Sequence, residues 1–239
     1  VKPSARTRVA TYMQSPEKPP VAVIAGPTAS GKSALALEMA RRENGVIINA
    51  DASQVYTDLR IISARPSKAD EAEVPHLLYG IIDGAIAWSA ADWAAQAKAS
   101  IDAVHSRGQL PILVGGTGLY LRTLLEGIAP VPGIDPDIRE KVRSLATEDL
   151  HPALFREDPA MAARLNPADR QRLCRALEVV RSSGHSLAEW QQQLEGGIAD
   201  HISLRPNVVA VDRDTLYQRC NQRFDAMIVD GALSEVALL

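Results

Sequence analysis

Eight consecutive residues near the start of the chain have the types and the spacing of a phosphate-binding loop. The pattern G-x-x-x-x-G-K-[S/T] is matched at every fixed position by Gly26, Pro27, Thr28, Ala29, Ser30, Gly31, Lys32 and Ser33. In such a P-loop the backbone amides surround a phosphate, and the helix that follows presents its positive end to the same anion. Lys32 supplies a point charge, and the Ser33 hydroxyl is suited to a Mg²⁺ shell. The sequence therefore predicts a site for a phosphorylated small molecule.

A candidate acid–base residue follows the next apolar segment. Residues 46–48 are Val-Ile-Ile and lead into a polar group, 49–54, that contains Asp51. In P-loop enzymes that hydrolyse ATP or GTP, an acidic residue in this place is a magnesium ligand. A carboxylate beside a bound phosphate is equally suited to act as a general base. The pattern alone leaves both roles open for Asp51.

The elements that must position these residues alternate between strands and helices. We expect strands at 21–25, 46–48, 77–82 and 111–114, a helix from the P-loop to about Arg42, and a helix that Ser89 caps and that ends near Arg107. This alternation predicts an α/β fold, with a P-loop NTPase-like core whose parallel sheet is flanked by helices. Ligands of such sheets bind beyond the carboxyl ends of the strands. Asp51 and the glycine-rich segment 115–118, with Thr117, are therefore expected near the P-loop.

The residue pattern changes after Gly127. A Pro- and Gly-rich linker precedes a long segment that is helical in pattern, in which Leu173, Leu177 and Val180 share one helix face. We expect an α/β core formed by 21–130 and 205–239, an all-helical insertion domain at 131–204, and a disordered lead-in at 1–20. A strand at 208–211 and a helix from Thr215 should return the chain to the core. Because the chain lacks an initiator Met and ends within a helix-like pattern, we also expect a further C-terminal region.

Composition limits the class of protein. The chain has 239 residues with a net charge of −3, which argues against a uniformly basic nucleic-acid-binding protein but not against a local basic patch. It contains no apolar run of membrane-spanning length, and its polar first residues do not resemble a secretory signal. Two cysteines lie far apart, and five histidines have no metal-ligand spacing. A cytoplasmic protein without a membrane partner is expected, and nothing in the sequence demands more than a monomer.

Several segments together resemble the tRNA dimethylallyltransferases, which prenylate an adenosine next to the anticodon. The P-loop has the form found in that family, and residues 114–120 read V-G-G-T-G-L-Y. Residues 51–56, 63–66, 74–76, 89–93 and 175–179 match further family segments in order and spacing. Ala52, Ser63 and Arg65 replace the usual Ser, Thr and Lys, and these exchanges look tolerable.

The resemblance implies a reaction and roles for the residues of the core. The P-loop would hold the diphosphate of dimethylallyl diphosphate, with Lys32 and a Mg²⁺ ion at Ser33 stabilising the leaving group. Asp51 would accept the proton from the exocyclic amine of adenine. Thr28 is a further catalytic candidate, because its hydroxyl lies within the loop, with a turn-stabilising role as the alternative. One arginine of the returning segment is expected to clamp the diphosphate, and Arg223 is preferred among the three candidates, Arg213, Arg219 and Arg223.

The resemblance also implies contacts with tRNA, through the anticodon stem-loop. The expected contacts are Asp51, Ala52, Ser53, Gln54 and Thr117 in the core, and Arg139, Gln171, Arg172, Leu173, Cys174 and Arg175 in the helical insertion. Some of these residues have a structural alternative: a solvated helix face for the arginines, a helix N-cap for Thr117, and a structural hydrogen bond for Gln54. The tryptophans, Trp88, Trp93 and Trp190, are expected to pack rather than to stack on bases.

Two other enzymatic interpretations stay open. A small-molecule P-loop kinase or NTPase would use ATP and close a lid over it, and the helical insertion resembles such a lid. An adenylate isopentenyltransferase would prenylate free AMP, ADP or ATP. A non-catalytic RNA-binding module is hard to reconcile with an intact P-loop and Asp51. ATP turnover and the choice of prenyl acceptor separate these classes.

Overall fold

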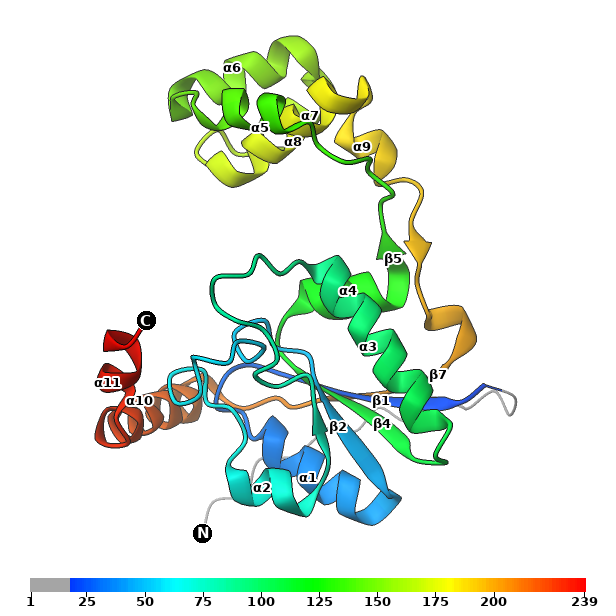
Figure 1. Cartoon of the computed structure of the whole chain (residues 1–239), viewed down its shortest axis with the longest axis vertical. Coiled ribbons are helices and arrows are strands. Elements are labelled where there is room, and N and C mark those ends of the chain that lie inside the picture. Colours follow the sequence, from blue (N-terminus) through cyan, green and yellow to red (C-terminus); the bar gives the residue numbers. More distant parts are fainter. Residues whose placement is uncertain (1–17) are drawn as a thin grey trace. The chain divides into compact units, whose positions relative to one another are not determined.

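The computed structural model describes residues 18–239, which form two compact units. Within the described residues, the first unit comprises 18–125 and 198–239, and the second comprises 126–197 (Figure 1). Residues 1–17, and with them most of the expected lead-in, lie outside the described residues. The lead-in was expected to reach residue 20, but Pro20 already begins a strand.

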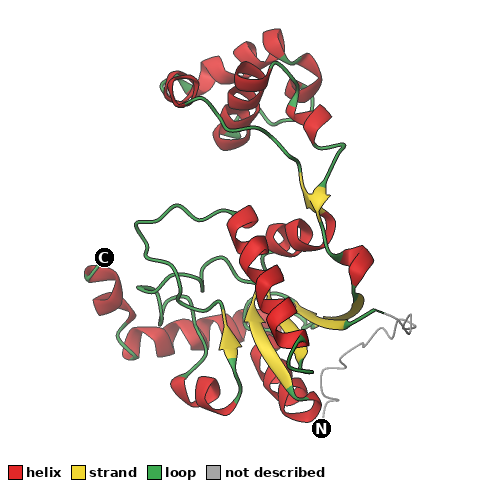
Figure 2. Cartoon of the chain, turned by 45° about the vertical axis from the view of Figure 1, so that its right-hand side comes forward, coloured by secondary structure: helices red, strands yellow, loops and turns green. Residues whose placement is uncertain are grey.

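The first unit contains a five-stranded sheet in the order β3-β2-β4-β1-β7, and every neighbouring pair is parallel. Figure 2 shows its strands in yellow between helices. The strands are β1 (Pro20–Ala25), β2 (Gly45–Asn49), β3 (His76–Leu77), β4 (Leu110–Gly115) and β7 (Ser203–Val208). The predicted parallel α/β core with flanking helices is confirmed.

Both faces of the sheet are covered by helices, which explains why its central strands are continuously apolar. Val21 and Val23 of β1 pack in one buried cluster with residues of α3 (Ala90–His105) and α4 (Gly118–Glu126). Ala22 and Ile24 alternate with them and pack on the other face against α1 (Lys32–Glu43). The sheet thereby forms a rigid base for the loops at its carboxyl edge.

Helix α3 begins where the sequence predicted. Ser89 and Asp92 form a reciprocal capping box, in which the Asp92 amide donates to Ser89 Oγ and the Ser89 amide donates to Asp92 Oδ2. Trp93 in the first turn is fully buried, stacks on Tyr120 and donates from Nε1 to the Asn49 carbonyl at 2.8 Å. It therefore packs, as expected, and also ties α3 to the end of β2.

Two of the expected strands have other bounds. The strand expected at 77–82 is only His76–Leu77, because Leu78 and Gly80 adopt positive φ angles of 63° and 56° that end it. The strand expected at 208–211 is Ser203–Val208. It lies at the edge of the sheet, where polar residues and Pro206 are tolerated, so its sequence lacks the apolar run of a central strand.

The second unit is mainly helical. Its helices are α5 (Pro136–Arg143), α6 (Thr147–Glu157), α7 (Pro159–Ala162), α8 (Arg170–Ser183) and α9 (Leu187–Trp190). It is not all-helical, because β5 (Gly127–Ile128) and β6 (Glu195–Gly196) pair as antiparallel strands. The β5–β6 pair belongs to the second unit, whereas β7 belongs to the sheet of the first unit. For this reason the bounds of the second unit are 126–197 and not the expected 131–204.

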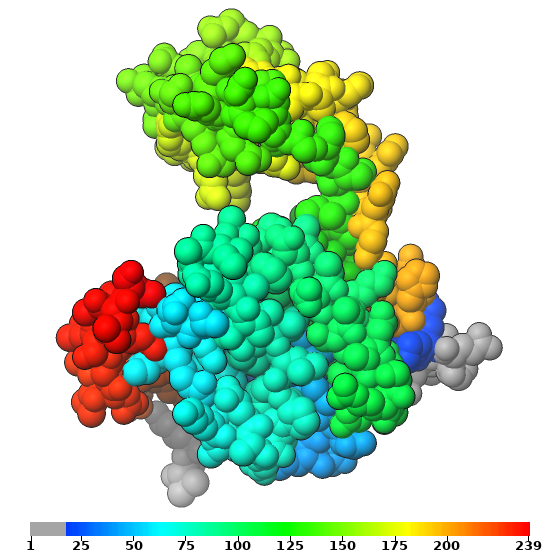
Figure 3. Space-filling view, viewed as in Figure 1, coloured from blue at the N-terminus to red at the C-terminus, as the bar shows by residue number. Residues whose placement is uncertain are grey.

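The remaining elements belong to the first unit: α2 (Lys68–Glu73), the 3₁₀ turn η1 (Ala199–His201), α10 (Arg213–Val229) and α11 (Ala232–Ala237). In Figures 1 and 3 the red end of the chain, α10 and α11, lies beside the cyan segment near residue 60. None of the helices in the described part of the chain is both long and apolar enough to cross a membrane.

Candidate active site

A hollow of about 360 Å³ contains the P-loop and the predicted acid–base residue together. Its lining comes from the P-loop, from the segments that follow β2 and β3, from the end of β4, and from α10. The lining residues are Thr28, Ala29, Ser30, Gly31, Lys32, Ser33, Asp51, Ser53, Gln54, Ile62, Ser63, Ala64, Tyr79, Val114, Gly115 and Arg223. The fold thus brings Lys32, Asp51 and Arg223 to one place from distant parts of the sequence.

The P-loop has the backbone and the donors that an anion requires. Gly31 has a φ of 97°, a value that strongly favours glycine, and α1 begins at the next residue. Lys32 Nζ donates to the Pro27 carbonyl at 2.6 Å, across the loop. Ser30 Oγ is buried and has no hydrogen-bond partner among the residues that the structure describes. A phosphate oxygen in the hollow would satisfy that hydroxyl.

Positive charge is concentrated in the hollow. Burial lowers the pKa of Lys32, and Arg223 lowers it further, while Asp51 acts in the opposite direction. The two cations destabilise one another unless a negative group lies between them. A bound diphosphate is such a group, so the electrostatics agree with the anion site that the P-loop predicts.

Asp51 is held in place by a buried asparagine. Asn49 Oδ1 accepts from the Asp51 amide at 2.8 Å, and Asn49 Nδ2 donates to the carbonyls of Asp51 and Leu78, each at 3.0 Å. The Asn49 side chain has no exposed surface. Asp51 Oδ1 in turn accepts from the amide of Ser53 at 3.0 Å and from its hydroxyl at 2.7 Å. The carboxylate is therefore oriented before any substrate binds.

The other predicted core residues mainly support this segment. Thr117 Oγ1 accepts from the Ala52 amide at 3.0 Å, so its hydroxyl fixes the loop that carries Asp51. Gly115 lacks the Cβ that would collide with the Ala50 carbonyl, which lets the loops after β2 and β4 touch. Gln54 Nε2 donates to the carbonyls of Ser63 and Ala64, both at 2.8 Å. Of the two roles expected for Gln54, the structure shows the structural hydrogen bond, made by its side-chain amide.

Of the six predicted RNA-contacting residues of the helical unit, three are exposed on α8 and one is fully buried. Gln171, Arg172 and Arg175 are exposed on α8, and Arg172 pairs with Asp169 at 3.4 Å. Leu173 is fully buried in the core of the unit, so the prediction that it contacts RNA is wrong. Its helix face points inward, as the Leu173–Leu177 spacing indicates.

The remaining two predicted contacts lie near a buried carboxylate. Arg139 lies 3.9 Å from Glu178, whose side chain is 3% exposed and is also paired with Arg143 at 3.0 Å. Cys174 is largely buried, but it lines a second hollow of about 680 Å³ together with exposed arginines of α5 and α8. This basic hollow lies within the helical unit.

Sequence reasoning missed several residues of the site. Asn49 was part of the recognised polar group but had no assigned role; its place at the end of a buried strand is the signal that it must be paired. Tyr79 lines the hollow. Burial raises the pKa of its hydroxyl, and the negative charges of Asp51 and Glu71 raise it further. Ile62, Ser63 and Ala64 also line the hollow. Ala64 has a φ of 53°, and such a turn leaves no clear mark in the sequence.

The residues present fit a magnesium ion that is bound chiefly through phosphate. No group of three or more His, Cys, Asp or Glu side chains within 18–239 is arranged to hold a metal ion. Ser33 and Asp51 nevertheless line the same hollow and offer oxygen ligands. Mg²⁺ commonly takes one or two protein oxygens and completes its shell with waters and substrate phosphates.

Comparisons with known proteins point to one family. A model of the IPP transferase family matches residues 54–239. The tRNA dimethylallyltransferase of Zymomonas mobilis is 57% identical over 226 residues, which are 95% of this chain and 72% of that protein. That of Erythrobacter litoralis is also 57% identical, over 93% of this chain and 72% of that protein.

Solved structures give the same result. A eukaryotic dimethylallyltransferase acting on tRNA superposes with a TM-score of 0.78 at 27% identity, covering 92% of this chain and 55% of that one. The tRNA isopentenylpyrophosphate transferase of Bacillus halodurans superposes with a TM-score of 0.61 at 32% identity, covering 93% of this chain and 70% of that one. The chain therefore belongs to the tRNA dimethylallyltransferase family, the IPP transferases.

Proposed function

We propose that this protein transfers a dimethylallyl group from dimethylallyl diphosphate to the exocyclic amine of the adenosine on the 3′ side of the anticodon in tRNA, releasing diphosphate. One observation carries the proposal most strongly: the P-loop, two cations and an oriented carboxylate line a single hollow. The names of the relatives agree with this reaction. A tRNA substrate would also place the enzyme in the cytoplasm.

The P-loop side of the hollow is suited to the leaving group. As the allylic carbon–oxygen bond breaks, positive charge develops on carbon and negative charge on the diphosphate oxygens. The P-loop amides, Lys32 and Arg223 are fixed donors that stabilise that negative charge as it forms. Ser33 would hold a Mg²⁺ ion, which would supply further positive charge to the leaving group. The Thr28 hydroxyl lines the same space and can donate to the diphosphate.

Asp51 is suited to the acceptor side of the reaction. The adenine nitrogen attacks the allylic carbon, a carbon–nitrogen bond forms, and the nitrogen loses one proton to the carboxylate. Because an aromatic amine is a weak nucleophile, its orientation matters more than the strength of the base. Asn49 and Ser53 provide that orientation by fixing Asp51.

The acceptor must leave the base stack to reach Asp51. Flipping a base costs a few kcal/mol and is cheapest in an irregular loop, which is where proteins read RNA sequence. The exposed Arg172 and Arg175, with Gln171, offer phosphate and polar contacts on the helical unit. We propose that these residues and Arg139 bind the anticodon stem-loop.

One experiment separates the proposal from its rivals. Labelled dimethylallyl diphosphate and Mg²⁺ are incubated with the protein and an anticodon stem-loop, with AMP and ATP as competing acceptors and Asp51→Ala as the control. We expect the label to move to the stem-loop alone and the Asp51→Ala variant to transfer none. Transfer only to free nucleotide would indicate an adenylate isopentenyltransferase, and ATP turnover without transfer would indicate a kinase or NTPase.

A further inference from the structure

Glu235, on α11, binds three consecutive backbone amides that lie 173 to 175 positions earlier in the chain. Its Oε1 accepts from the amides of Arg60 and Ile61, both at 2.7 Å, and its Oε2 accepts from those of Ile61 and Ile62 at 3.0 and 2.9 Å. Successive amides that converge on one anion form a nest. Both carboxylate oxygens are used, so Glu235 joins α11 firmly to this turn.

The turn that Glu235 holds continues directly into the lining of the phosphate hollow. We call residues 60–64 the pocket wall, because Ile62, Ser63 and Ala64 line the hollow. The Gln54 side chain holds the far end of this wall through the carbonyls of Ser63 and Ala64. The Gln54 amide donates to the Asp51 carbonyl at 3.2 Å. Glu235 is therefore linked to Asp51 through the backbone of the wall, the Gln54 side chain and the hydrogen bonds at each end of them.

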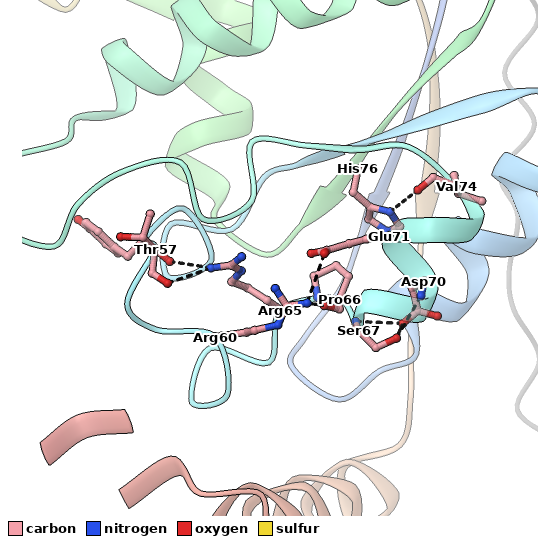
Figure 4. A network of polar contacts seen from close by, with 10 residues as sticks. Thr57, Arg60, Arg65, Pro66, Ser67, Asp70, Glu71, Val74 and His76 are labelled. Carbon is pink, nitrogen blue, oxygen red and sulfur yellow. Dashed lines mark hydrogen bonds and ion pairs between the residues drawn. The ribbon is translucent and has the colours of Figure 1, made fainter. Parts of the chain in front are cut away.

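The arginines of this region do not replace Glu235 as the support of the wall. In Figure 4, Arg60 donates to the Pro66 carbonyl and pairs with Glu71, while Arg65 donates to the Thr57 carbonyl. Arg65 also donates to the Tyr56 carbonyl. Both guanidinium groups thus brace neighbouring backbone. The amides of Arg60, Ile61 and Ile62 point instead to the carboxylate of α11.

The charged form of Glu235 is the one that the nest favours. Burial raises its pKa, but the hydrogen bonds from the amides of Ile62, Ile61 and Arg60, with the nearby Arg65, outweigh burial and hold it below the usual range. Hydrogen bonds to a charged acceptor are stronger than those between neutral groups. The wall is therefore braced by an ionised carboxylate at neutral pH.

We propose that Glu235 is a positioning residue for the phosphate hollow: it fixes the pocket wall and thereby sets the affinity for the diphosphate substrate. The identity of that substrate rests on the proposed function. The role itself requires only that a diphosphate binds where the P-loop and the wall meet. Glu235 touches no reacting atom and acts through Ile62, Ser63 and Ala64.

The test compares Glu235→Ala and Glu235→Gln with the unaltered chain. Glu38→Gln is the matched control, because Glu38 is 69% exposed on α1 and, among residues 18–239, its one ion pair is a 3.9 Å contact with Arg42. The measurements are hydrogen exchange of the backbone amides in 60–64, calorimetric titration with Mg²⁺ and inorganic diphosphate, thermal unfolding, and the KM values for dimethylallyl diphosphate and stem-loop.

We expect Glu235→Ala to speed exchange in 60–64 and to weaken diphosphate binding about tenfold, the loss that follows if the displaced wall costs the bound diphosphate about one charge-assisted hydrogen bond. The KM for dimethylallyl diphosphate should rise by a similar factor while the KM for the stem-loop does not change. Glu235→Gln keeps one acceptor oxygen, so its exchange rate and its diphosphate affinity should lie between those of Glu235→Ala and the unaltered chain. This variant serves as the test if Glu235→Ala does not fold. Glu38→Gln should match the unaltered chain.

Two results would overturn the inference. One is unchanged exchange in 60–64 in both Glu235→Ala and Glu235→Gln. The other is faster exchange with unchanged diphosphate affinity, which would make the nest a purely structural contact. If the unaltered chain transfers no prenyl group but the Glu235 variants still lose diphosphate affinity, the proposed function fails and the role of Glu235 stands.

Discussion

Replacing Asn49 by alanine removes the side chain that orients Asp51. The change deletes the bonds to the Asp51 amide, the Asp51 carbonyl and the Leu78 carbonyl. Asn49 has no exposed surface, so water does not replace the three hydrogen bonds that are lost. At about 1 kcal/mol for each intramolecular hydrogen bond, the free energy of unfolding should fall by about 3 kcal/mol. The Asp51 segment would also be free to shift, and a displacement of about 1 Å at a reacting group costs about 100-fold in rate.

The two effects are measured separately. Urea unfolding gives the stability of Asn49→Ala, and steady-state transfer to the stem-loop gives kcat and KM for each substrate below the unfolding transition. We expect kcat to fall and the KM for dimethylallyl diphosphate to change little, because the P-loop is untouched. Asn221→Ala, at an exposed position on α10, controls for the loss of an asparagine side chain. A destabilised Asn49→Ala whose kcat stays within about twofold of the unaltered chain would refute the argument that Asn49 positions the base.

Three further predictions follow from other parts of the structure. Lys32→Ala should lower kcat at least about 100-fold, as loss of one preorganised donor to a developing negative charge does, and rapid-quench kinetics would show it. Leu173→Ala should lower the free energy of unfolding of the helical unit by about 3 kcal/mol, measured by thermal or urea unfolding. Arg172→Ala should leave that free energy within about 0.5 kcal/mol of the unaltered chain. It should instead reduce by about one the slope of the logarithm of the stem-loop binding constant against the logarithm of the salt concentration. The pKa of Glu235 is lowered in the folded protein, so its contribution to stability is present in full above the ordinary pKa of glutamate and is lost as the pH falls through the lowered value. The stability difference between the unaltered chain and Glu235→Gln should therefore shrink in acid, and a difference that grows instead would contradict the nest.

Local patterns made the P-loop and the capping box of α3 predictable. The P-loop needs a fixed run of residues, and Ser89 with Asp92 satisfies amides within one turn. Strands β1, β2 and β4 were recognisable because burial on both faces demands an apolar run. Strand β7 was misplaced because an edge strand carries no such demand, and β3 was overextended because the left-handed turn at Leu78 is not visible in its residue type.

Long-range contacts set the limit of sequence-based prediction for the site. Asp51 was identified, but the support of its segment by Thr117 depends on how the loops after β2 and β4 meet. The bond from the Asp51 amide to Asn49 is local, whereas the bond from Asn49 to the Leu78 carbonyl again joins distant segments. The contact between Glu235 and residues 60–62 joins segments that are distant in the sequence, so no local pattern predicts it. Leu173 received two conflicting predictions, an RNA contact from resemblance and a core position from periodicity. The structure follows the periodicity, because helical spacing reports which side chains must be buried.

The role of Asp51 as the base is tested most directly by single-turnover transfer with Asp51→Asn. This variant keeps an oxygen that can accept from Ser53 but removes the negative charge that takes the proton. We predict that the rate of transfer to the stem-loop falls about 1,000-fold, within the range for loss of a general base, while the affinities for dimethylallyl diphosphate and stem-loop stay within about threefold. Transfer at nearly the unaltered rate would contradict this role, and so would a loss of substrate affinity that accounts for the whole effect.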